Sequence, residues 1–336
     1  MNTKLIAALV CAAPFVATAA QAQEFTWEGS LEFTHDNTFK SDDPTKEFGA
    51  TGATLDLSAA YQFNETFGVF GALTGENLND ATPADKHFTD WGLYVKELGF
   101  TISTQHATFA VGKVSPVFGI AWDATAGYFA SDLAEDYELT EQLGGLAEVE
   151  LGDAGALHFG LFFADDTALG KSVGFRRPQN TTAAGGAGNT GKLNNGSVTW
   201  VKGFNDTEVR LGVRRLSAGI GDVKDETGVV ASVQHSFANL PLDAFAEFAQ
   251  FEGFEGTADK ATYATLNAAY AIGEVTLSGT YALRDITNRE KTEVLSIGAE
   301  YEFGERYLIG AALAQVKEGA VTDQVLGVNF EIALGS

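Results

Sequence analysis

Residues 54–63 read TLDLSAAYQF, in which the apolar residues at 55, 57, 59, 61 and 63 alternate with mostly polar ones. A period of two places successive side chains on opposite faces of an extended strand, so this stretch predicts a strand with one apolar and one polar face. The same alternation recurs at 25–33 and at 326–334, near both ends of the chain. No segment after residue 22 shows a sustained apolar stripe with the 3.6-residue period of a helix. The pattern predicts an all-β protein.

The connections between the predicted strands alternate in length along the whole chain. Short turns, such as 64–66 and 153–155, are separated by longer polar stretches, such as 36–50, 114–142, 166–195 and 317–322. An up-and-down meander has this rhythm when one rim carries tight turns and the other carries long loops. The strand segments number 16, an even number as a closed bacterial barrel requires. We therefore predict a 16-stranded antiparallel up-and-down transmembrane β-barrel.

The main alternative is a soluble β-sandwich, whose strands also alternate apolar and polar residues. A sandwich of 336 residues would normally divide into domains joined by a linker, and no linker is evident. Aromatic residues also gather beside the short turns, as they do in the interfacial girdle of a membrane barrel. These residues are Phe63, Phe67, Phe204, Phe237, Tyr270, Phe303 and Tyr307. The barrel is favoured over the sandwich.

Composition excludes two other classes of protein. The 45 acids exceed the 21 bases and give a net charge of -24, which argues against nucleic-acid binding through neutralised phosphates. A mean hydropathy of -0.01 excludes a helical membrane bundle, which needs apolar runs of about 20 residues.

The first 22 residues have the pattern of a secretory signal peptide. Lys4 is followed by an apolar stretch at 5–19 and by Ala20-Gln21-Ala22, an A-x-A cleavage site. We therefore divide the chain into a signal peptide, 1–22, and one barrel domain, 23–336. Cys11, the single cysteine, falls in the signal peptide, so the barrel has no disulfide framework. An exported barrel predicts the bacterial outer membrane as the location, with membrane lipid around it.

Residues 97–119, ELGFTISTQHATFAVGKVSPVFG, resemble Gram-negative general porins. In that family a strand, a tight turn and a strand ending in glycine and a base precede a long third loop. Gly112-Lys113 matches this ending, and the loop follows at 114–142. The resemblance implies a homotrimer in which the third loop folds into each water-filled pore. It also implies passive diffusion of ions and small hydrophilic solutes.

Two features depart from that family. Its last strand usually ends in an aromatic residue that the assembly machinery recognises, whereas this chain ends at Ser336. The family also commonly sets bases on the early strands against the acids of the third loop. Residues 23–39 and 51–75 contain no Lys or Arg, so the usual charge arrangement does not transfer to this chain.

The third long loop is acidic throughout and contains no base. Its acids are Asp123, Asp132, Glu135, Asp136, Glu138 and Glu141. If the loop folds inward, low-dielectric walls focus the field of these acids, and acidic rings favour cations in channels. The apolar residues Trp122, Tyr128, Phe129 and Tyr137 would anchor it there. We predict that these acids form a mildly cation-selective constriction; a solvated exterior loop is the alternative.

Alternation also predicts the pore wall. Along the segment that begins at Thr207, residues 209, 211 and 213 are apolar and face lipid, so Glu208, Arg210 and Arg214 face the lumen. Other strands add Glu28, Glu32, Asp56, Glu148, Glu150, Arg284 and Glu300 by the same parity. Two roles are open for Arg210 and Arg214: they oppose the acidic loop across the pore, or they pair with carboxylates of the wall.

The fourth long connection is basic, with Lys171, Arg176, Arg177 and Lys192 against Asp166. The pattern favours a mobile exterior loop. Its bases also suit lipopolysaccharide phosphates, which makes that lipid a candidate partner.

These observations predict a passive diffusion channel and no enzyme activity. A substrate-specific channel, for example for a sugar, is the first alternative. A barrel enzyme such as a phospholipase is the second, although neither an HExxH nor a GxSxG motif is present. No cofactor is predicted. Ca²⁺ is an alternative, because its preference for oxygen ligands suits the clustered carboxylates, although no EF-hand spacing is present.

Overall fold

The computed structural model describes residues 24–79 and 84–335, so the predicted signal peptide lies outside the described residues. Within them, eighteen strands form one sheet, and two of these, β4 (Lys86–His87) and β9 (Val173–Gly174), are two residues long. The other sixteen are β1 (Glu24–Ser41), β2 (Gly49–Gln62), β3 (Phe67–Asn77), β5 (Trp91–Ser103), β6 (Ala107–Val114), β7 (Gln142–Glu150), β8 (Ala156–Ala164), β10 (Asn195–Phe204), β11 (Thr207–Leu216), β12 (Glu226–Ser236), β13 (Leu242–Glu252), β14 (Lys260–Ile272), β15 (Val275–Ile286), β16 (Thr292–Phe303), β17 (Tyr307–Glu318) and β18 (Val321–Gly335).

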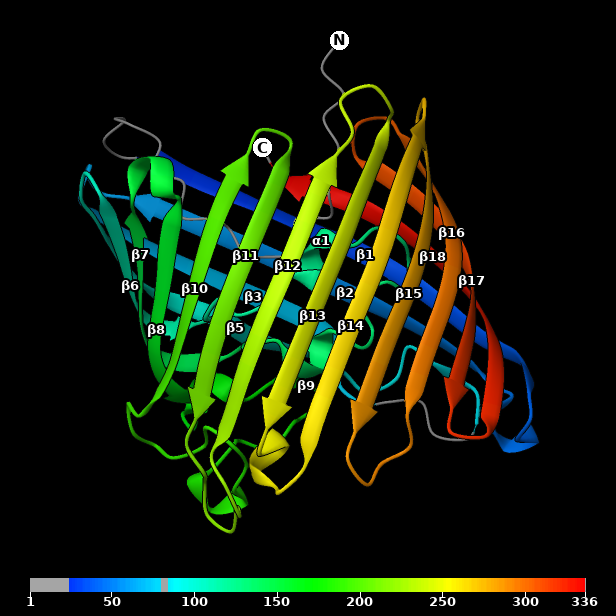
Figure 1. The fold of residues 1–336 in the computed structure, drawn as a ribbon, viewed down its shortest axis with the longest axis horizontal. Helices are drawn as coiled ribbons and strands as arrows, with labels where there is room; N and C mark the ends of the chain where they lie inside the picture. Colours follow the sequence, from blue (N-terminus) through cyan, green and yellow to red (C-terminus); the bar gives the residue numbers. More distant parts are fainter. Residues whose placement is uncertain (1–23, 80–83, 336) are drawn as a thin grey trace.

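The sheet closes on itself because β1 pairs antiparallel with β2 on one side and with β18 on the other (Figure 1). Each of the other long strands pairs antiparallel with its neighbours in chain order; β4 and β9 are extra pieces between them. Closure removes the two free edges of the sheet, so backbone groups find partners within the wall. The predicted 16-stranded antiparallel barrel is confirmed.

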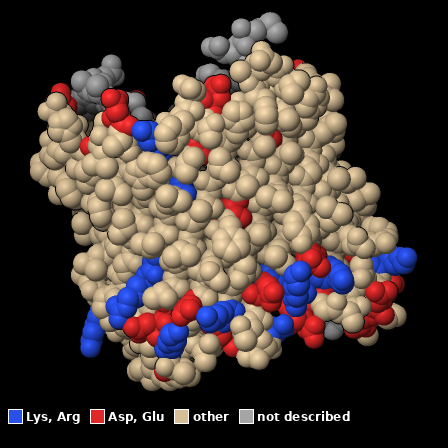
Figure 2. Space-filling model, in the orientation of Figure 1, with Lys and Arg blue, Asp and Glu red and all other residues tan. Residues whose placement is uncertain are grey.

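The outer surface has the character that a barrel wall needs in lipid. Leu211 and Val213 of β11 are half exposed, whereas Arg214, which follows Val213 in the same strand, is buried on the inner face. Figure 2 shows a broad band with few charged side chains, and most Lys, Arg, Asp and Glu gather at the lower rim, where Figure 1 shows the long loops. All seven aromatic residues predicted beside the short turns are exposed. No helix in the described ranges is long and apolar enough to cross a membrane.

Within residues 24–79 and 84–335, helical structure is confined to single turns in the connections. These turns are η1 (Pro44–Lys46), α1 (Ala121–Ala124), η2 (Glu135–Tyr137), η3 (Gly152–Ala154), η4 (Ala168–Gly170), η5 (Thr182–Ala184) and η6 (Phe254–Gly256).

Two predicted loops are shorter than the sequence suggested. The stretch 317–322, predicted as a long connection, is a turn of two residues between β17 and β18, with Gly319 at φ 57°. The stretch 36–50 was also predicted as a loop, but β1 continues to Ser41 because Asp36 to Ser41 pair with Gly327 to Asp323 of β18. In both places strand pairing overrides the polar local composition.

The third connection leaves the wall early. β6 ends at Val114, and its Gly112 has φ 147°, a backbone conformation that residues other than glycine rarely adopt. A Cβ at Gly112 would lie 2.2 Å from the carbonyl oxygen of Leu98, so the position also requires glycine sterically. The chain then runs through residues 115–141, here called the inner segment, before β7 begins.

Candidate functional site

The inner segment is fixed, near its start and near its end, to one carboxylate of the opposite wall. Glu247 of β13 accepts the backbone N–H groups of Ile120 (2.9 Å) and Ala121 (3.2 Å) and the hydroxyl of Tyr137 (2.6 Å). Glu247 is 2 % exposed, whereas the next residue, Phe248, lies on the outer face and is 48 % exposed. Since neighbouring residues of a strand point to opposite faces, these contacts are made on the inner face of the wall.

Further contacts extend along the same inner face. Asn267 of β14 accepts the backbone N–H of Ala126 (3.1 Å) and donates to the Ala126 carbonyl (2.8 Å). On β18, a Cβ at Gly327 would lie 2.4 Å from the ring of Tyr128, so the ring packs directly on this glycine. The inner segment therefore contacts inward-facing positions of strands that are far apart around the barrel.

An aromatic cluster fills the space between the inner segment and the wall. Phe118 and Tyr137 of the segment are almost fully buried, and Tyr137 packs 5.0 Å from Tyr263 and 5.7 Å from Phe251, between ring centroids. Phe129, one of the predicted anchors, is also buried. Phe118 escaped the sequence analysis because it lies beside Pro116 and Gly119, outside any alternating pattern.

Two of the six predicted acids are paired with bases. Asp136 accepts hydrogen bonds from the hydroxyl of Tyr263 (3.0 Å) and from Nη1 of Arg284 on β15 (3.0 Å). Glu141 lies 2.6 Å from Nζ of Lys113 and 2.5 Å from Nη2 of Arg177. Their negative charges are largely neutralised, so Asp136 and Glu141 contribute little to a field in the lumen.

The other four acids make no ion pair within the described part of the chain; they are Asp123, Asp132, Glu135 and Glu138. Burial raises the pKa of Glu138, while Lys96 lowers this pKa and the charges of Glu135, Glu97 and Asp56 raise it. Glu97 belongs to β5 and Asp56 to β2. Acids of the inner segment thus lie near acids of the wall, and the bases Lys96 and Arg210 lie near them.

The wall on that side carries more acids than the sequence analysis named. Glu32 of β1 lies in register with Glu331 of β18, and Asn329 donates to Glu32 at 2.8 Å. Asp56 accepts the hydroxyl of Thr74 at 2.6 Å. Glu331 and Glu97 were missed by the sequence analysis, although the alternating pattern contained the signal. Phe330 and Ile332, which flank Glu331, belong to the apolar set of the last strand, and Leu98, which follows Glu97, is exposed on the outer face. Glu28, near the start of β1, is exposed and lies 3.5 Å from the hydroxyl of Ser58.

The two arginines predicted on the wall at β11, Arg210 and Arg214, are both paired with carboxylates. Arg210 binds its neighbour Glu208, with Nε and Nη2 at 2.8 and 2.7 Å from the same oxygen. Arg214 binds Glu226 at 2.6 Å and donates to the carbonyl of Tyr137 at 2.6 Å.

The assignment of Arg214 to the pore lining needs correction. Its side chain points inward but is buried, and its guanidinium lies 4.7 Å from the ring centroid of Phe118 and 4.6 Å from that of Phe251. The inner segment covers this arginine, so its charge is not presented to the lumen. Of the two roles considered for Arg214, the structure supports pairing with a carboxylate of the wall, Glu226.

Neither a metal centre nor a histidine cluster emerges from the described residues. No group of three or more His, Cys, Asp or Glu among them is placed to hold a metal ion, which leaves the suggested Ca²⁺ without a site there. His35 and His87 both bond to Thr51, and His235 bonds to Thr207.

Known proteins share the fold and a sequence profile with this chain. The profile of the family described as Gram-negative porin matches residues 7–320. The outer membrane channel DcaP of Acinetobacter baumannii superposes with a TM-score of 0.65 at 12% identity, over 93% of this chain and 98% of that one. A loop L8 deletion mutant of the outer membrane protein OmpT of Vibrio cholerae has a TM-score of 0.63 at 12% identity, over 94% and 100%. The anion-selective porin of Comamonas acidovorans has a TM-score of 0.58 at 13% identity, over 93% and 100%. No curated protein sequence matches the chain.

Proposed function

Because this chain belongs to the Gram-negative porin family, we propose that it forms a water-filled channel for passive diffusion of ions and small hydrophilic solutes, with a preference for cations. The inner segment narrows the pore, and the space left between this segment and the wall that carries Asp56 and Glu97 selects solutes by size. The channel lies in the outer membrane.

The observation that carries the cation preference is the presence of acids on both sides of this space. Asp123, Asp132, Glu135 and Glu138 come from the inner segment, and Asp56 and Glu97 come from the wall. Low-dielectric walls concentrate the field of such groups, so the local cation concentration rises and anions are repelled. Two bases, Lys96 and Arg210, lie near these acids. They offset only part of the negative charge, because Arg210 is already paired with Glu208.

Reconstitution in planar lipid bilayers tests this function. We expect stepwise conductance in KCl and, under a salt gradient, a reversal potential whose sign indicates cation preference. The absence of conductance steps from correctly folded protein would overturn the channel, and a reversal potential of the opposite sign would overturn the acidic filter. Conductance blocked by one particular solute would instead indicate a substrate-specific channel.

The cation preference is also expected to depend on pH. Burial, followed by the charge of Glu138, raises the pKa of Asp123 to about 7, while Lys96 and Arg210 oppose the rise. A carboxyl group with this pKa is charged above neutral pH and protonated below it. The reversal potential should therefore shift toward zero as the pH falls from about 8 to about 6.

Asp123 shares this pH range with a second acid of the inner segment, because burial, followed by the charge of Glu135, raises the pKa of Asp132 to about 7. The variant Asp123→Asn measures the contribution of Asp123. It should show a smaller shift of reversal potential over the same pH range, because one of the two titrating groups is absent. A shift equal to that of the unaltered protein would assign the pH dependence to other groups.

We further propose that the protein assembles as a homotrimer in contact with lipopolysaccharide. Support for the trimer comes from family membership and from a similar structure, OmpT of Vibrio cholerae, described in a trimer form. Of the bases in the fourth long connection, Arg177 is held by Glu141 and is not available to a lipid phosphate, which leaves Lys171, Arg176 and Lys192 for that role.

A further inference from the structure

The early departure of the inner segment leaves a notch in the barrel wall. The last residue pair between β5 and β6 joins Leu98 to Lys113, so residues 91–97 of β5 have no partner on β6. β9 fills this place: Gly92 pairs with Gly174, Leu93 pairs with Val173, and the N–H of Phe175 donates to the carbonyl of Trp91 at 2.9 Å. β9 belongs to residues 165–177, here called the strap, which follow β8.

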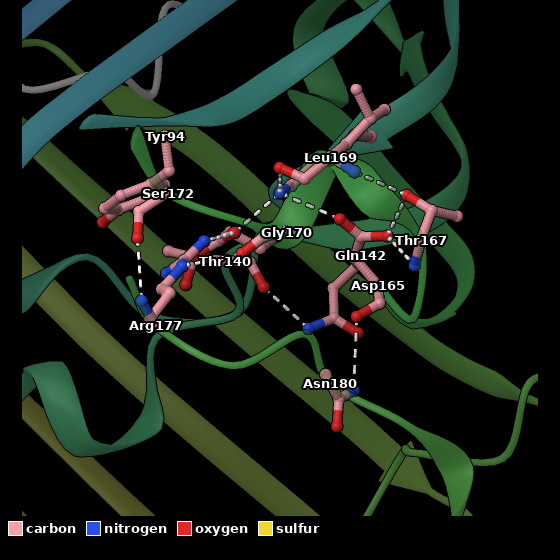
Figure 3. Close-up of polar contacts among 12 residues, drawn as sticks. Tyr94, Thr140, Gln142, Asp165, Thr167, Leu169, Gly170, Ser172, Arg177 and Asn180 are labelled. Carbon is pink, nitrogen blue, oxygen red and sulfur yellow. Dashed lines mark hydrogen bonds and ion pairs between the residues drawn. The ribbon is translucent and has the colours of Figure 1, made fainter. Parts of the chain in front are cut away.

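A fully buried lysine joins the strap to the inner segment. Nζ of Lys113 has three oxygen neighbours: Oε2 of Glu141 at 2.6 Å, Oδ2 of Asp165 at 2.9 Å and the carbonyl of Leu169 at 3.4 Å. Figure 3 shows the surroundings of this cluster, with Asp165 and Leu169 of the strap close together. Glu141 and Leu169 accept hydrogen bonds from the ammonium group, and Asp165 adds the charge of an ion pair. A buried ammonium group needs such partners, because its charge is costly to remove from water.

Arg177 of the strap extends the cluster to the next strand. Its Nη1 and Nη2 donate to the two carboxylate oxygens of Glu141 at 2.8 and 2.5 Å. Its guanidinium lies 3.7 Å from the ring centroid of Tyr94 on β5, and the hydroxyl of Tyr94 donates to Glu76 of β3 at 2.6 Å. Glu141 is thus shared between Lys113 and Arg177, and the strap is tied to both sides of the notch.

The four charged groups of this cluster lie at the ends of the two segments that they join. Lys113 precedes the inner segment and Glu141 is its last residue, while Asp165 and Arg177 lie at the two ends of the strap. Burying paired charges gives little net stability compared with apolar packing, but it specifies one geometry, because each charge is strongly destabilised without its partner. Directional contacts of this kind suit a group that holds two segments in a defined relative position.

We propose that Lys113 and Glu141 are positioning residues for the pore: they fix both ends of the inner segment and hold the strap in the notch that the segment leaves. The inference rests on the proposed channel function. When the cluster is intact, the inner segment stays at one distance from the acidic wall, and the current through the open channel is steady. Without it, the strap leaves β5 and the segment moves.

Single-channel recording of the full protein with Lys113→Met tests this role. Methionine keeps most of the length and removes the charge. We expect open-channel current noise to rise at least twofold, with frequent partial closures, and the cation preference to fall. Lys291→Met is the matched control, because Lys291 pairs with Glu293 at 3.0 Å on the exposed rim; its current should match that of the unaltered protein. Arg177→Met, which leaves both ion pairs of Lys113 in place, should give an intermediate noise level and serves if Lys113→Met does not fold.

A disulfide provides a rescue that a purely stabilising role would not predict. Leu93 and Val173 are directly paired in antiparallel strands, where Cα atoms lie about 4.5–5.5 Å apart, within the range of a disulfide. In the Lys113→Met background, Leu93→Cys with Val173→Cys should restore a steady current under oxidation and lose it on reduction.

The outcomes separate the two proposals. If the unaltered protein does not conduct, the channel function fails. If it conducts and the folded Lys113→Met and Arg177→Met proteins are as steady as it is, or if the cross-link restores nothing, the positioning role is overturned while the channel stands.

Discussion

Removing the four acids of the inner segment that make no ion pair should reduce the ratio of cation to anion permeability roughly threefold or more, since charges in such a confined space create potentials of several kT. The variant combines Asp123→Asn, Asp132→Asn, Glu135→Gln and Glu138→Gln. Each replacement keeps the shape of the side chain and removes one negative charge. The acids of the wall remain, so the preference for cations should weaken without reversing. Reversal potentials in a KCl gradient measure the ratio.

The matched control removes the same number of acids from the rim of short turns. Glu65→Gln, Asp206→Asn, Glu274→Gln and Glu305→Gln replace exposed residues that lie outside the pore. Their charges face bulk solvent, where salt screens them within about 8 Å at physiological ionic strength, so the permeability ratio should hardly change. An equal loss in both variants would show that overall charge, and not the inner segment, sets the preference.

Arg214→Met should destabilise the folded barrel by about 3–5 kcal/mol, because it leaves the buried carboxylate of Glu226 without its partner. Arg214 and Glu226 are 6 % and 2 % exposed and lie 2.6 Å apart, and Arg214 also donates to the carbonyl of Tyr137. The free energy of unfolding is measured by urea denaturation of the protein refolded in detergent. The double variant Arg214→Met with Glu226→Gln should recover part of the loss, because the unpaired charge is then absent.

The next residue along the chain supplies the control. Arg215 forms an ion pair of similar length, 2.5 Å, with Asp225, but its side chain is 56% exposed. Exposed pairs contribute about 0–1 kcal/mol, so Arg215→Met should change the free energy of unfolding by no more than this. Equal effects of the two variants would contradict the conclusion that burial decides the importance of the pair.

The barrel was predictable from the sequence because its determinants are local. A period of two assigns each residue to the lipid face or the lumen face, and the rhythm of short and long connections gives the order of the strands. Loop lengths were less predictable. Residues 36–41 are mostly polar, and their composition predicted a loop. They nevertheless continue β1, because β18 offers partners for their backbone groups.

The candidate site was predictable only in part. Parity placed Glu32, Asp56 and Arg214 on the inner face, and the base-free loop was recognised from its composition. Strand parity and loop composition could not predict which of these charges remain unpaired. Asp136 meets Arg284 and Glu141 meets Arg177 only after folding, and these partners are 148 and 36 residues away in sequence.

The sequence by itself thus determined the membrane barrel, the direction of its side chains and the surplus of acids in residues 115–141. Tertiary structure alone decided which of these acids keep their charge in the lumen, which arginine is buried, and how the strap closes the wall beside β5. The physical reason is that alternation is set by the geometry of a single strand. The effect of a charge depends instead on its distance to other charges and to water, and the closed barrel fixes those distances.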